Sequence, residues 1–274
     1  MFERTPNKML DKIRAGKPAY GMQSYIHNSA LYEVAGWAGM DFCMIDMEHC
    51  RLNYESMVDI IRTCEMSGMT PLVRVPENSK TWIRYALESG ARGVVVPHIK
   101  SGEDVRKAQE ALRFPPEGRA GVCPAVRACK YAQGNWEEYM KESNKNTSLI
   151  VLFEDVEAIE NVDEILAELK PGRDGYGMGN ADIAHALYTD DKEPVNWRHP
   201  YCAEAQQIVV PKAKALGLFN QSMAFTPDVE GIKGSRAAGG DAIMFHPDID
   251  LFQRTVIGLV KAGEEADKFF ESQK

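Results

Sequence analysis

The sequence lacks long apolar runs, basic clusters and paired cysteines. No stretch of its 274 residues approaches the roughly 18 apolar residues of a membrane-spanning helix, and residues 1–8 lack the apolar core of a secretory signal. We therefore expect a cytoplasmic protein. The formal net charge of −8, with no run of Lys and Arg, gives no electrostatic footprint for nucleic acid or an anionic membrane. The expected partner is a small molecule.

The composition is that of a globular protein, with 44% apolar and 26% charged residues. No composition shift or Gly/Ser-rich linker divides the chain, so we expect one domain over residues 1–274. The six cysteines form no CxxC pair, which favours buried thiols over a disulfide framework or a zinc site.

Short β-rich apolar runs alternate with longer amphipathic segments along the chain. Continuous apolar strands separated by helices predict a parallel sheet covered on both faces, and eight such units have the size of a closed (β/α)8 TIM barrel. A doubly wound open sheet is the alternative. The predicted strands are residues 19–25, 41–46, 70–75, 92–97, 148–153, 174–178, 218–223 and 241–245.

Three further features of the sequence carry predictions about the barrel. Several strands follow similar Gly-containing segments, "AGMD", "SGARG", "PGRDG" and "AGGD", in which the glycine fits a helix C-cap. Residues 115–145 are long for one connection, which predicts an active-site loop with a short helix of its own. Residues 249–271 are predicted to form the last barrel helix.

Polar and charged residues gather where the predicted strands end, which is where TIM barrels carry their active sites. Desolvating such a ring would cost several kcal/mol per group unless the groups shared ligands, so we expect a metal and an anionic substrate at this mouth. The residues concerned are Asp46, Glu48, His49, Arg74, His98, Glu154, Asp155, the segment 177–182, Gln221, Ser222, His246 and Asp248.

Glu154 and Asp182 are the metal-ligand candidates. They leave adjacent strands, and each offers a carboxylate oxygen to a hard divalent ion such as Mg2+ or Mn2+. The alternative is that Glu154 is a favourable charge at the start of one helix and Asp182 caps the next.

His49 is the candidate general base, with Asp46 three positions earlier holding one ring nitrogen. A plain surface histidine is the alternative. Arg74 is unusual on a buried strand and suits a carboxylate, an enolate oxygen, or the side chain of Glu48 or Glu88. The segment "GYGMGN" lacks the spacing of a nucleotide-binding loop and instead predicts backbone N–H groups exposed to a carboxylate.

At these residues the sequence resembles the HpcH/HpaI family of class II pyruvate aldolases over nearly its whole length. "DFCMIDMEHC" resembles the family's "DWxxIDxEH", "PLVRVPE" its "VRxP" and "FPPEGRAG" its "YPPxGxRG". "ALESGARGVVVPHIKSGEDVRKA", "LFEDVEAIENVDEIL" and "GMGNADIAHAL" are similar to its "LDxGAxGxxxPxVxSxEEA", "QIETxEAVxNxDEI" and "GPxDLSxSL".

The resemblance implies a phosphoenolpyruvate/pyruvate-binding type of TIM barrel. It also implies that the last helix is exchanged between subunits of a homohexamer built of dimers. By position it implies Glu154 and Asp182 as ligands of a divalent metal, His49 as acid/base, Asp46 as its orienting partner and Arg74 as the group facing the enolate.

The chain also departs from this family pattern. Glu88 replaces a common Asp and is taken as a catalytic carboxylate, Leu152 replaces a Gln, and Asn180 replaces a Pro. The strand end "FHPD" replaces a Gly-containing turn. The pyruvate half of the site is thus expected to be retained and the pocket for the second fragment to be altered.

These residues predict reversible cleavage of a 4-hydroxy-2-oxo acid to pyruvate, or a related 2-oxo acid, and an aldehyde. Arg74 and the backbone of Gly179, Asn180, Ala181 and Asp182 would hold the substrate. The predicted strand ends offer no Schiff-base lysine, since Lys100 lies beyond Pro97.

Three other functions stay open. One is an oxaloacetate-like 2-oxo-acid decarboxylase. Another is an acyl-CoA lyase, for which the basic contacts would be Arg119, Arg127 and Lys130. The third is a protein that binds a 2-oxo acid without turnover.

Overall fold

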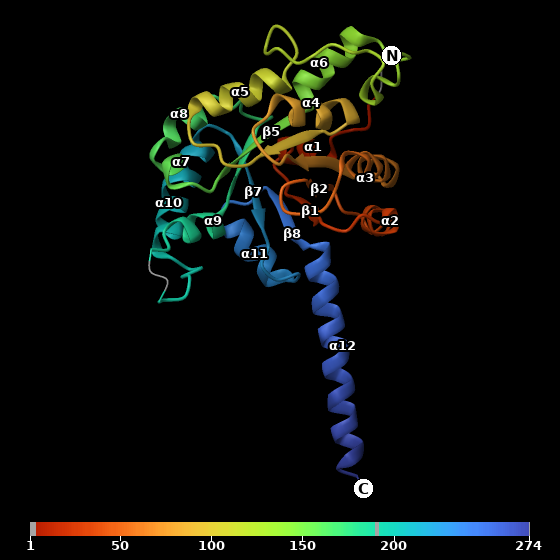
Figure 1. The fold of residues 1–274 in the computed structure, drawn as a ribbon, viewed down its shortest axis with the longest axis vertical. Coiled ribbons are helices and arrows are strands. Elements are labelled where there is room, and N and C mark those ends of the chain that lie inside the picture. Colours follow the sequence, from red (N-terminus) through yellow and green to blue (C-terminus); the bar gives the residue numbers. More distant parts are fainter. Residues whose placement is uncertain (1–3, 190–191, 274) are drawn as a thin grey trace.

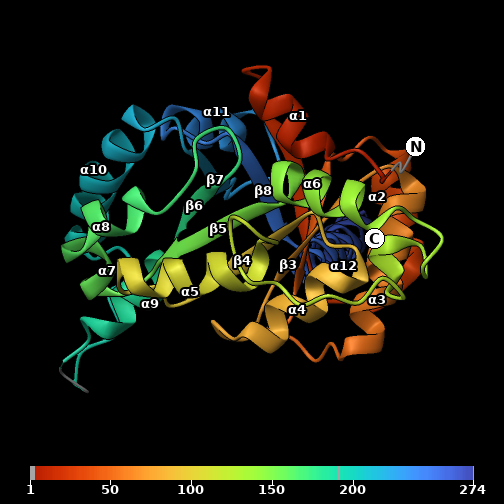
Figure 2. The ribbon, with the colours of Figure 1, turned by 90° about the horizontal axis from the view of Figure 1, so that it is seen from above.

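The computed structural model describes residues 4–189 and 192–273. Eight parallel strands follow one another in sequence order and close into a barrel where β8 pairs with β1. Figures 1 and 2 show the helices arranged around this barrel. The TIM-barrel prediction is confirmed, and the open doubly wound sheet is wrong.

The observed strands match the predicted ones to within two residues. Each pairs in parallel with the next, and Asp46 of β2 lies directly opposite Arg74 of β3. The strands are β1 (Ala19–Ser24), β2 (Phe42–Asp46), β3 (Thr70–Arg74), β4 (Gly93–Val96), β5 (Ser148–Phe153), β6 (Gly175–Met178), β7 (Phe219–Met223) and β8 (Ala242–Pro247).

Side-chain caps define where many of the helices begin. Asn53, for example, accepts a hydrogen bond from the N–H of Ser56 at the start of α3, and Ser101 accepts one from Asp104 at the start of α5. The helices are α1 (Lys8–Arg14), α2 (Ser29–Trp37), α3 (Tyr54–Ser67), α4 (Lys80–Ser89), α5 (Gly102–Leu112), α6 (Trp136–Asn146), α7 (Val156–Glu160), α8 (Val162–Ala167), α9 (Asn180–Ala186), α10 (Pro200–Ala215), α11 (Val229–Ala237) and α12 (Asp248–Glu271), with a 3-10 turn at Arg127–Cys129.

The barrel interior is a packed core of its own, separate from the core between strands and helices. Phe42 and Phe219 are its largest members, and Met9 and Leu10 of α1 enter it from the end where the strands begin. A Cβ on Gly175 would lie 2.4 Å from the Phe219 ring, so glycine there makes room for the phenylalanine. The interior is therefore filled, and ligands are restricted to its far end.

Three aspartates at strand entries fix the register of the barrel. Asp41, Asp174 and Asp241 each stand just before a strand, and each carboxylate accepts a hydrogen bond from a backbone N–H of the preceding strand. Those donors are Tyr20, Leu149 and Asn220, at 2.9, 3.0 and 3.0 Å. The similar Gly- and Asp-containing segments before these strands thus make the same contact three times, a hydrogen bond from a backbone N–H of the preceding strand to the aspartate.

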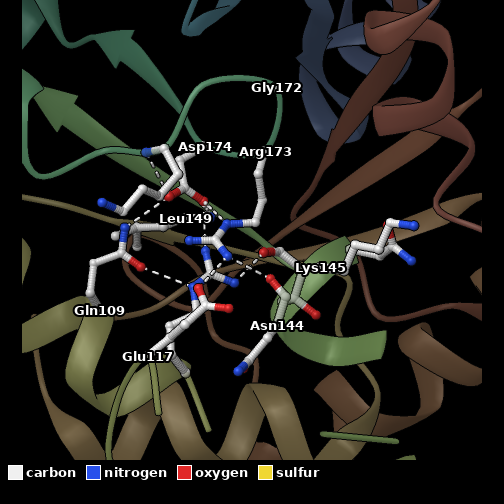
Figure 3. A network of polar contacts seen from close by, with 12 residues as sticks. Gln109, Glu117, Asn144, Lys145, Leu149, Gly172, Arg173 and Asp174 are labelled. Atoms are coloured by element: carbon white, nitrogen blue, oxygen red, sulfur yellow. Dashed lines mark hydrogen bonds and ion pairs between the residues drawn. The ribbon is translucent and has the colours of Figure 1, made fainter. Parts of the chain in front are cut away.

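Asp174 is the centre of a larger buried network, drawn in Figure 3. Its two oxygens accept hydrogen bonds from Arg113 at 2.6 Å, Gln109 at 2.8 Å and the backbone of Leu149 and Lys170. Burial lowers the pKa of Arg113 to about 10, although the charge of Asp174 opposes this shift. The network joins α5, β5 and β6 at the end where the strands begin.

The segment 115–145 is not an active-site loop, contrary to the prediction. It connects the end of α5 to the start of β5, and helix-to-strand connections lie at the end of a barrel opposite the active site. Arg127 confirms this placement, because it donates to the carbonyl of Ser89 at the last turn of α4 and pairs with Glu65 of α3. The short helix expected there is α6.

Helix α12 projects away from the barrel as a single extension in Figure 1. Of its 24 residues only Asp248 is buried. Asp248 accepts hydrogen bonds from the backbone N–H groups of Tyr25 and Ile26, both at 3.0 Å, so the start of the helix ties β8 to the segment after β1. Within residues 4–189 and 192–273, no helix has both the length and the apolar character needed to cross a bilayer.

Replacing Asp174 with alanine should strongly destabilise the protein. The change would leave the Arg113 guanidinium buried without its carboxylate, which typically costs about 3–5 kcal/mol of unfolding free energy. Urea unfolding measures the loss. The matched control is Asp163→Ala, which removes the exposed partner of Lys212 and should change stability by less than about 1 kcal/mol. Equal losses in the two variants would contradict this account.

Glu142 should make stability depend on acid pH. Burial raises its pKa, but hydrogen bonds from Arg92 at 2.6 and 3.0 Å and the charge of Arg4 outweigh burial and lower the pKa to about 2. The pKa of a glutamate in the unfolded chain is about 4.3. A carboxyl group with a lower pKa in the folded protein stabilises the fold at pH values above about 4.3. The contribution is lost as the pH falls towards 2.

Accordingly, Glu142→Gln should lower the unfolding free energy by about 2–3 kcal/mol at neutral pH. Thermal unfolding measured from pH 7 downwards should show this difference shrinking below the unfolded pKa. Glu137→Gln, on the same helix at an exposed position, is the control. A difference between wild type and Glu142→Gln that stays constant with pH would contradict the assignment.

Candidate active site

A cavity of about 880 Å³ opens at the carboxyl ends of the strands. Its walls come from the ends of β1, β2, β3 and β5–β8 and from α9, α10 and α11. Seven of the residues predicted for the site line it: His49, Arg74, Glu154, Gly179, Asn180, Ala181 and Asp182. The structure thus brings together most of the residues selected at the strand ends.

Asp46 is fully buried beneath the cavity and holds the neighbouring groups in place. Its carboxylate pairs with Arg74 and accepts hydrogen bonds from Gln23 at 2.6 Å and from the backbone N–H groups of Glu48 and His49. Burial raises the pKa of Asp46, but the hydrogen bond and charge of Arg74 outweigh it, and the net shift is downward. Asp46 is therefore a charged anchor.

The predicted contact between Asp46 and the His49 ring is wrong. The two oxygens of Asp46 are already occupied by Arg74, Gln23 and backbone donors, so Asp46 positions the main chain of His49 and not its imidazole. The carboxylate beside the ring belongs to Glu48, whose Oε2 lies 3.7 Å from His49 Nε2. The His49 side chain is half exposed at the mouth.

Glu48 lies among the side chains of Arg74, His98 and His49. Its Oε2 is 3.1 Å from Arg74 Nη1, and its Oε1 is 3.7 Å from His98 Nε2. Its side chain is 10% exposed, and burial raises its pKa in spite of Arg74. Oε2 of Glu48 and Nε of Arg74 are buried without a hydrogen-bond partner, which is costly unless a ligand supplies one.

Glu154 follows β5 directly and is almost completely buried. Its Oε1 accepts a hydrogen bond from the backbone N–H of His98 at 2.7 Å. Burial, and to a smaller extent the charges of Glu48 and Asp182, raise its pKa to about 7, although His98 acts in the opposite direction. The shift therefore comes mainly from loss of solvent around Glu154, and the negative charges of Glu48 and Asp182 add to it.

Asp182 does not cap a helix, so that alternative is wrong. It lies in the first turn of α9, whose N-cap is Gly179 and has no side-chain cap hydrogen bond. Asn180 Oδ1 is another buried acceptor without a partner. The first N–H groups of α9, from Asn180 to Asp182, have no partner within the helix and begin at the cavity wall.

Gly179 contributes space rather than a hydrogen bond. Its N–H already donates to the carbonyl of Phe153 at 2.9 Å, so the expectation that it binds a substrate carboxylate is wrong. A Cβ at this position would lie 2.3 Å from Glu154 Cβ and 2.6 Å from Glu154 Oε2. Glycine therefore lets α9 begin directly beside the Glu154 carboxylate.

The donor atoms at the mouth fit a divalent cation. In residues 4–189 and 192–273, one group of three metal-ligating side chains lies close enough to share an ion, namely Glu48, His98 and Glu154, with donor atoms within 4.8 Å of one another. Asp182 is not in this group, but it lines the same cavity and its charge acts on Glu154. Carboxylate oxygens and an imidazole nitrogen are suitable ligands for such ions.

The structure does not bring Glu88 to this cavity, and its role as a catalytic residue stays a prediction. Glu88 lies in the last turn of α4, which runs back from the mouth to the opposite end of the barrel. Burial raises its pKa, although the charge of Arg84 acts in the opposite direction. Leu152 does line the cavity, as its position on β5 predicted.

Some residues of the site were missed or left without a role. Gln23 is a buried polar residue near the end of β1, which is a usable signal for a site residue. Tyr25 follows it at the cavity wall, where burial and the charge of Asp46 raise its pKa to about 12. Glu48 and His98 were recognised at strand ends but given no function. Trp197 and Phe225 line the cavity from segments with no sequence signal.

Comparisons with known proteins identify the family of this chain. The model of the HpcH/HpaI aldolase/citrate lyase family matches residues 20–245. A 5-keto-4-deoxy-D-glucarate aldolase of Escherichia coli is 32% identical over 212 residues, which are 77% of this chain and 80% of the relative. A 2-dehydro-3,6-dideoxy-6-sulfogluconate aldolase of Pseudomonas putida is 30% identical over 199 residues, covering 73% of this chain and 75% of the relative.

Solved structures show the same relationship. A HpcH/HpaI aldolase/citrate lyase family protein from Burkholderia cenocepacia superposes with a TM-score of 0.83 at 26% identity, over 94% of this chain and 99% of the other. The fold, the residues at the mouth and these matches lead to one conclusion. The chain belongs to the HpcH/HpaI aldolase/citrate lyase family, a family of carbon–carbon lyases.

Proposed function

We propose that the protein catalyses metal-dependent, reversible cleavage of a 4-hydroxy-2-oxo acid to pyruvate, or a related 2-oxo acid, and an aldehyde. The observation that carries the proposal is the meeting of Arg74, His49, Glu154 and Asp182 at one cavity. The two aldolase relatives support the substrate class, because both are named for keto-deoxy sugar acids.

In this mechanism Arg74 and the start of α9 bind the 2-oxo acid. Arg74 lines the cavity, where its positive charge would stabilise the developing enolate oxygen, and the pairs with Asp46 and Glu48 keep the guanidinium fixed. The N–H groups of Asn180, Ala181 and Asp182 hold the substrate carboxylate. Both contacts place the bond to be cleaved towards His49.

His49 moves the proton in this reaction. Its ring is at the mouth, next to Glu48, and takes the proton of the C4 hydroxyl during cleavage. In the direction of synthesis it returns the proton to the aldehyde oxygen. Asp46 sets where the His49 main chain lies, so it acts as a positioning residue.

Glu154 and Asp182 would hold a divalent ion such as Mg2+ or Mn2+, which when bound stabilises negative charge on the 2-oxo oxygen as a Lewis acid. The crowding of carboxylates around Glu154 supports this assignment, since a cation would relieve it. Lys100 is engaged with Asp155 and Glu157, which leaves it unsuited to form an imine with the substrate.

Pyruvate release from a panel of 4-hydroxy-2-oxo acids tests the proposal. We expect release that EDTA abolishes and added Mg2+ or Mn2+ restores. Glu154→Gln should lower kcat/KM by about 100-fold or more, because several kcal/mol of charge stabilisation would be lost. Glu160→Gln, an exposed change on α7, is the matched control and should be fully active.

Three outcomes would contradict the proposal. Full activity in EDTA, or irreversible inactivation by borohydride with pyruvate, would replace metal catalysis with imine chemistry. Turnover of oxaloacetate without cleavage of any 4-hydroxy-2-oxo acid would assign a decarboxylase. Binding of metal and pyruvate without any product would assign a 2-oxo-acid-binding protein. An acyl-CoA lyase has less support, because Arg127 contacts α3 and α4 at the opposite end of the barrel.

We further propose that the chain is one barrel domain whose α12 is exchanged with a second copy in a hexamer built of dimers. Two observations support this assembly. Helix α12 exposes an apolar stripe that includes Ile249, Phe252, Val256 and Val260. Helix α2 likewise exposes Leu31, Val34 and Trp37, which a second copy would cover.

Light scattering after size-exclusion chromatography should give a mass six times that of the chain. The double variant Phe252→Asp and Val256→Asp should dissociate this assembly, because it places two charges in the apolar stripe. Lys261→Glu is the control, since it changes charge on the same helix at an exposed position. A monomeric wild-type protein, or a double variant of unchanged mass, would refute the exchange.

A further inference from the structure

His98 has an unusual backbone at the end of β4. Its φ is 52°, in the left-handed region that histidine seldom adopts. This bend lets its N–H donate to Glu154 while its ring stays at the mouth. Such strained residues persist only where the surrounding contacts determine them, and they concentrate at functional sites.

The His98 ring is held by a carboxylate on one side. Its Nδ1 lies 3.0 Å from Asp155 Oδ2, and Lys100 Nζ lies 3.1 Å from the other oxygen of Asp155. An Nδ1–H donor to Asp155 leaves Nε2 as the nitrogen with a free lone pair. Metal-binding histidines commonly have this arrangement, in which a carboxylate fixes the tautomer and orients the ring.

The His98 ring lies close to two carboxylates, one beside each ring nitrogen. Nε2 is 3.7 Å from Oε1 of Glu48, whose side chain is 10% exposed, and Nδ1 is 3.8 Å from Oε1 of the almost completely buried Glu154. Neighbouring ligands of an ion, each at about 2.1 Å, are about 3.0–3.4 Å apart, and opposite ligands about 4.2 Å. The donor atoms of Glu48, His98 and Glu154 lie within 4.8 Å of one another, so side-chain movements of about 1–2 Å would close the site.

We infer that His98 Nε2 is a nitrogen ligand of the divalent ion, together with Glu154 and Glu48, and that Asp155 is its positioning residue. The inference rests on the proposed function in taking a metal to be bound at this mouth. It adds the His98 imidazole and the Glu48 carboxylate to the two carboxylates assigned above, Glu154 and Asp182.

An imidazole ligand changes which ions the site prefers. Mg2+ favours oxygen ligands and retains several waters, whereas Co2+, Ni2+ and Zn2+ bind imidazole well, with affinity rising from Mn2+ through Co2+ to Ni2+. The protein should therefore select a transition metal over Mg2+. This preference is a property of the Glu48, His98 and Glu154 group and is measurable without turnover.

Metal titration of the untagged, EDTA-treated full chain tests the inference. Calorimetry should give a clearly tighter Kd for Co2+ than for Mg2+. His98→Asn should weaken Co2+ binding by about 10- to 100-fold and alter the visible Co2+ spectrum, with little change for Mg2+. Asparagine tolerates the left-handed conformation, so this variant keeps the turn.

Two further variants complete the design. Asp155→Asn should weaken Co2+ binding in the same direction, because the ring loses its charged partner. His27→Asn is the matched control, since His27 also lies near a carboxylate, Asp59, but belongs to no metal group in the described part of the chain. It should bind Co2+ like the wild type. Circular dichroism confirms that each variant is folded.

The outcomes separate this inference from the proposed function. Equal wild-type affinities for Co2+ and Mg2+, or an unchanged Kd and spectrum in His98→Asn, would overturn the role of His98 and leave the proposed cleavage intact. A wild-type protein that binds neither ion, with or without pyruvate, would instead overturn the metal-dependent function. A loss of Co2+ binding in His27→Asn as large as that in His98→Asn would also contradict the inference.

Discussion

The buried ion pair between Asp46 and Arg74 is the contact on which the active-site end of the barrel depends. The two residues are direct partners across β2 and β3, at the last position of each strand. Burying two charges is favourable only if their remaining donors and acceptors are satisfied, and Asp46 meets this need with Gln23 and two backbone N–H groups. The same bonds fix where Glu48 and His49 lie, so one carboxylate places an arginine, a second carboxylate and an imidazole.

The charge balance around this pair leaves negative charge uncompensated at the mouth of the barrel. Arg74 compensates Asp46 and part of Glu48, but Glu154 is left with the backbone of His98 as its hydrogen-bond donor and has a pKa of about 7. The opposite end of the barrel is different, since there Asp174 has Arg113 and Glu142 has Arg92 and Arg4. Ion pairs hold the structure together at one end and remain incomplete at the other, where substrate enters.

Much of this arrangement could be predicted from the sequence, because strand ends in a parallel barrel must meet. That rule placed His49, Arg74, Glu154 and Asp182 at one cavity. It could not show that the Asp46 carboxylate accepts hydrogen bonds from backbone N–H groups, or that the His49 ring lies beside Glu48. The conformation of the loop after β2 decides both. Glu88 and the segment 115–145 lie away from this cavity. The direction of the chain decides this, because a helix that follows a strand returns to the opposite end of the barrel. An apolar stripe in the sequence predicts that α12 is a helix. The stripe does not tell whether the helix packs against its own barrel or against a second copy of the chain.

The aspartates at the strand entries have a consequence for how such a barrel diversifies. Asp41, Asp174 and Asp241 lock neighbouring strands at the end away from the chemistry. Insertions, deletions and substitutions in the loops after the strands therefore leave the register of the barrel strands unchanged. The end of the barrel where the strands begin is thus fixed by these contacts, and the loops at the other end can change without disturbing the pairing of the strands.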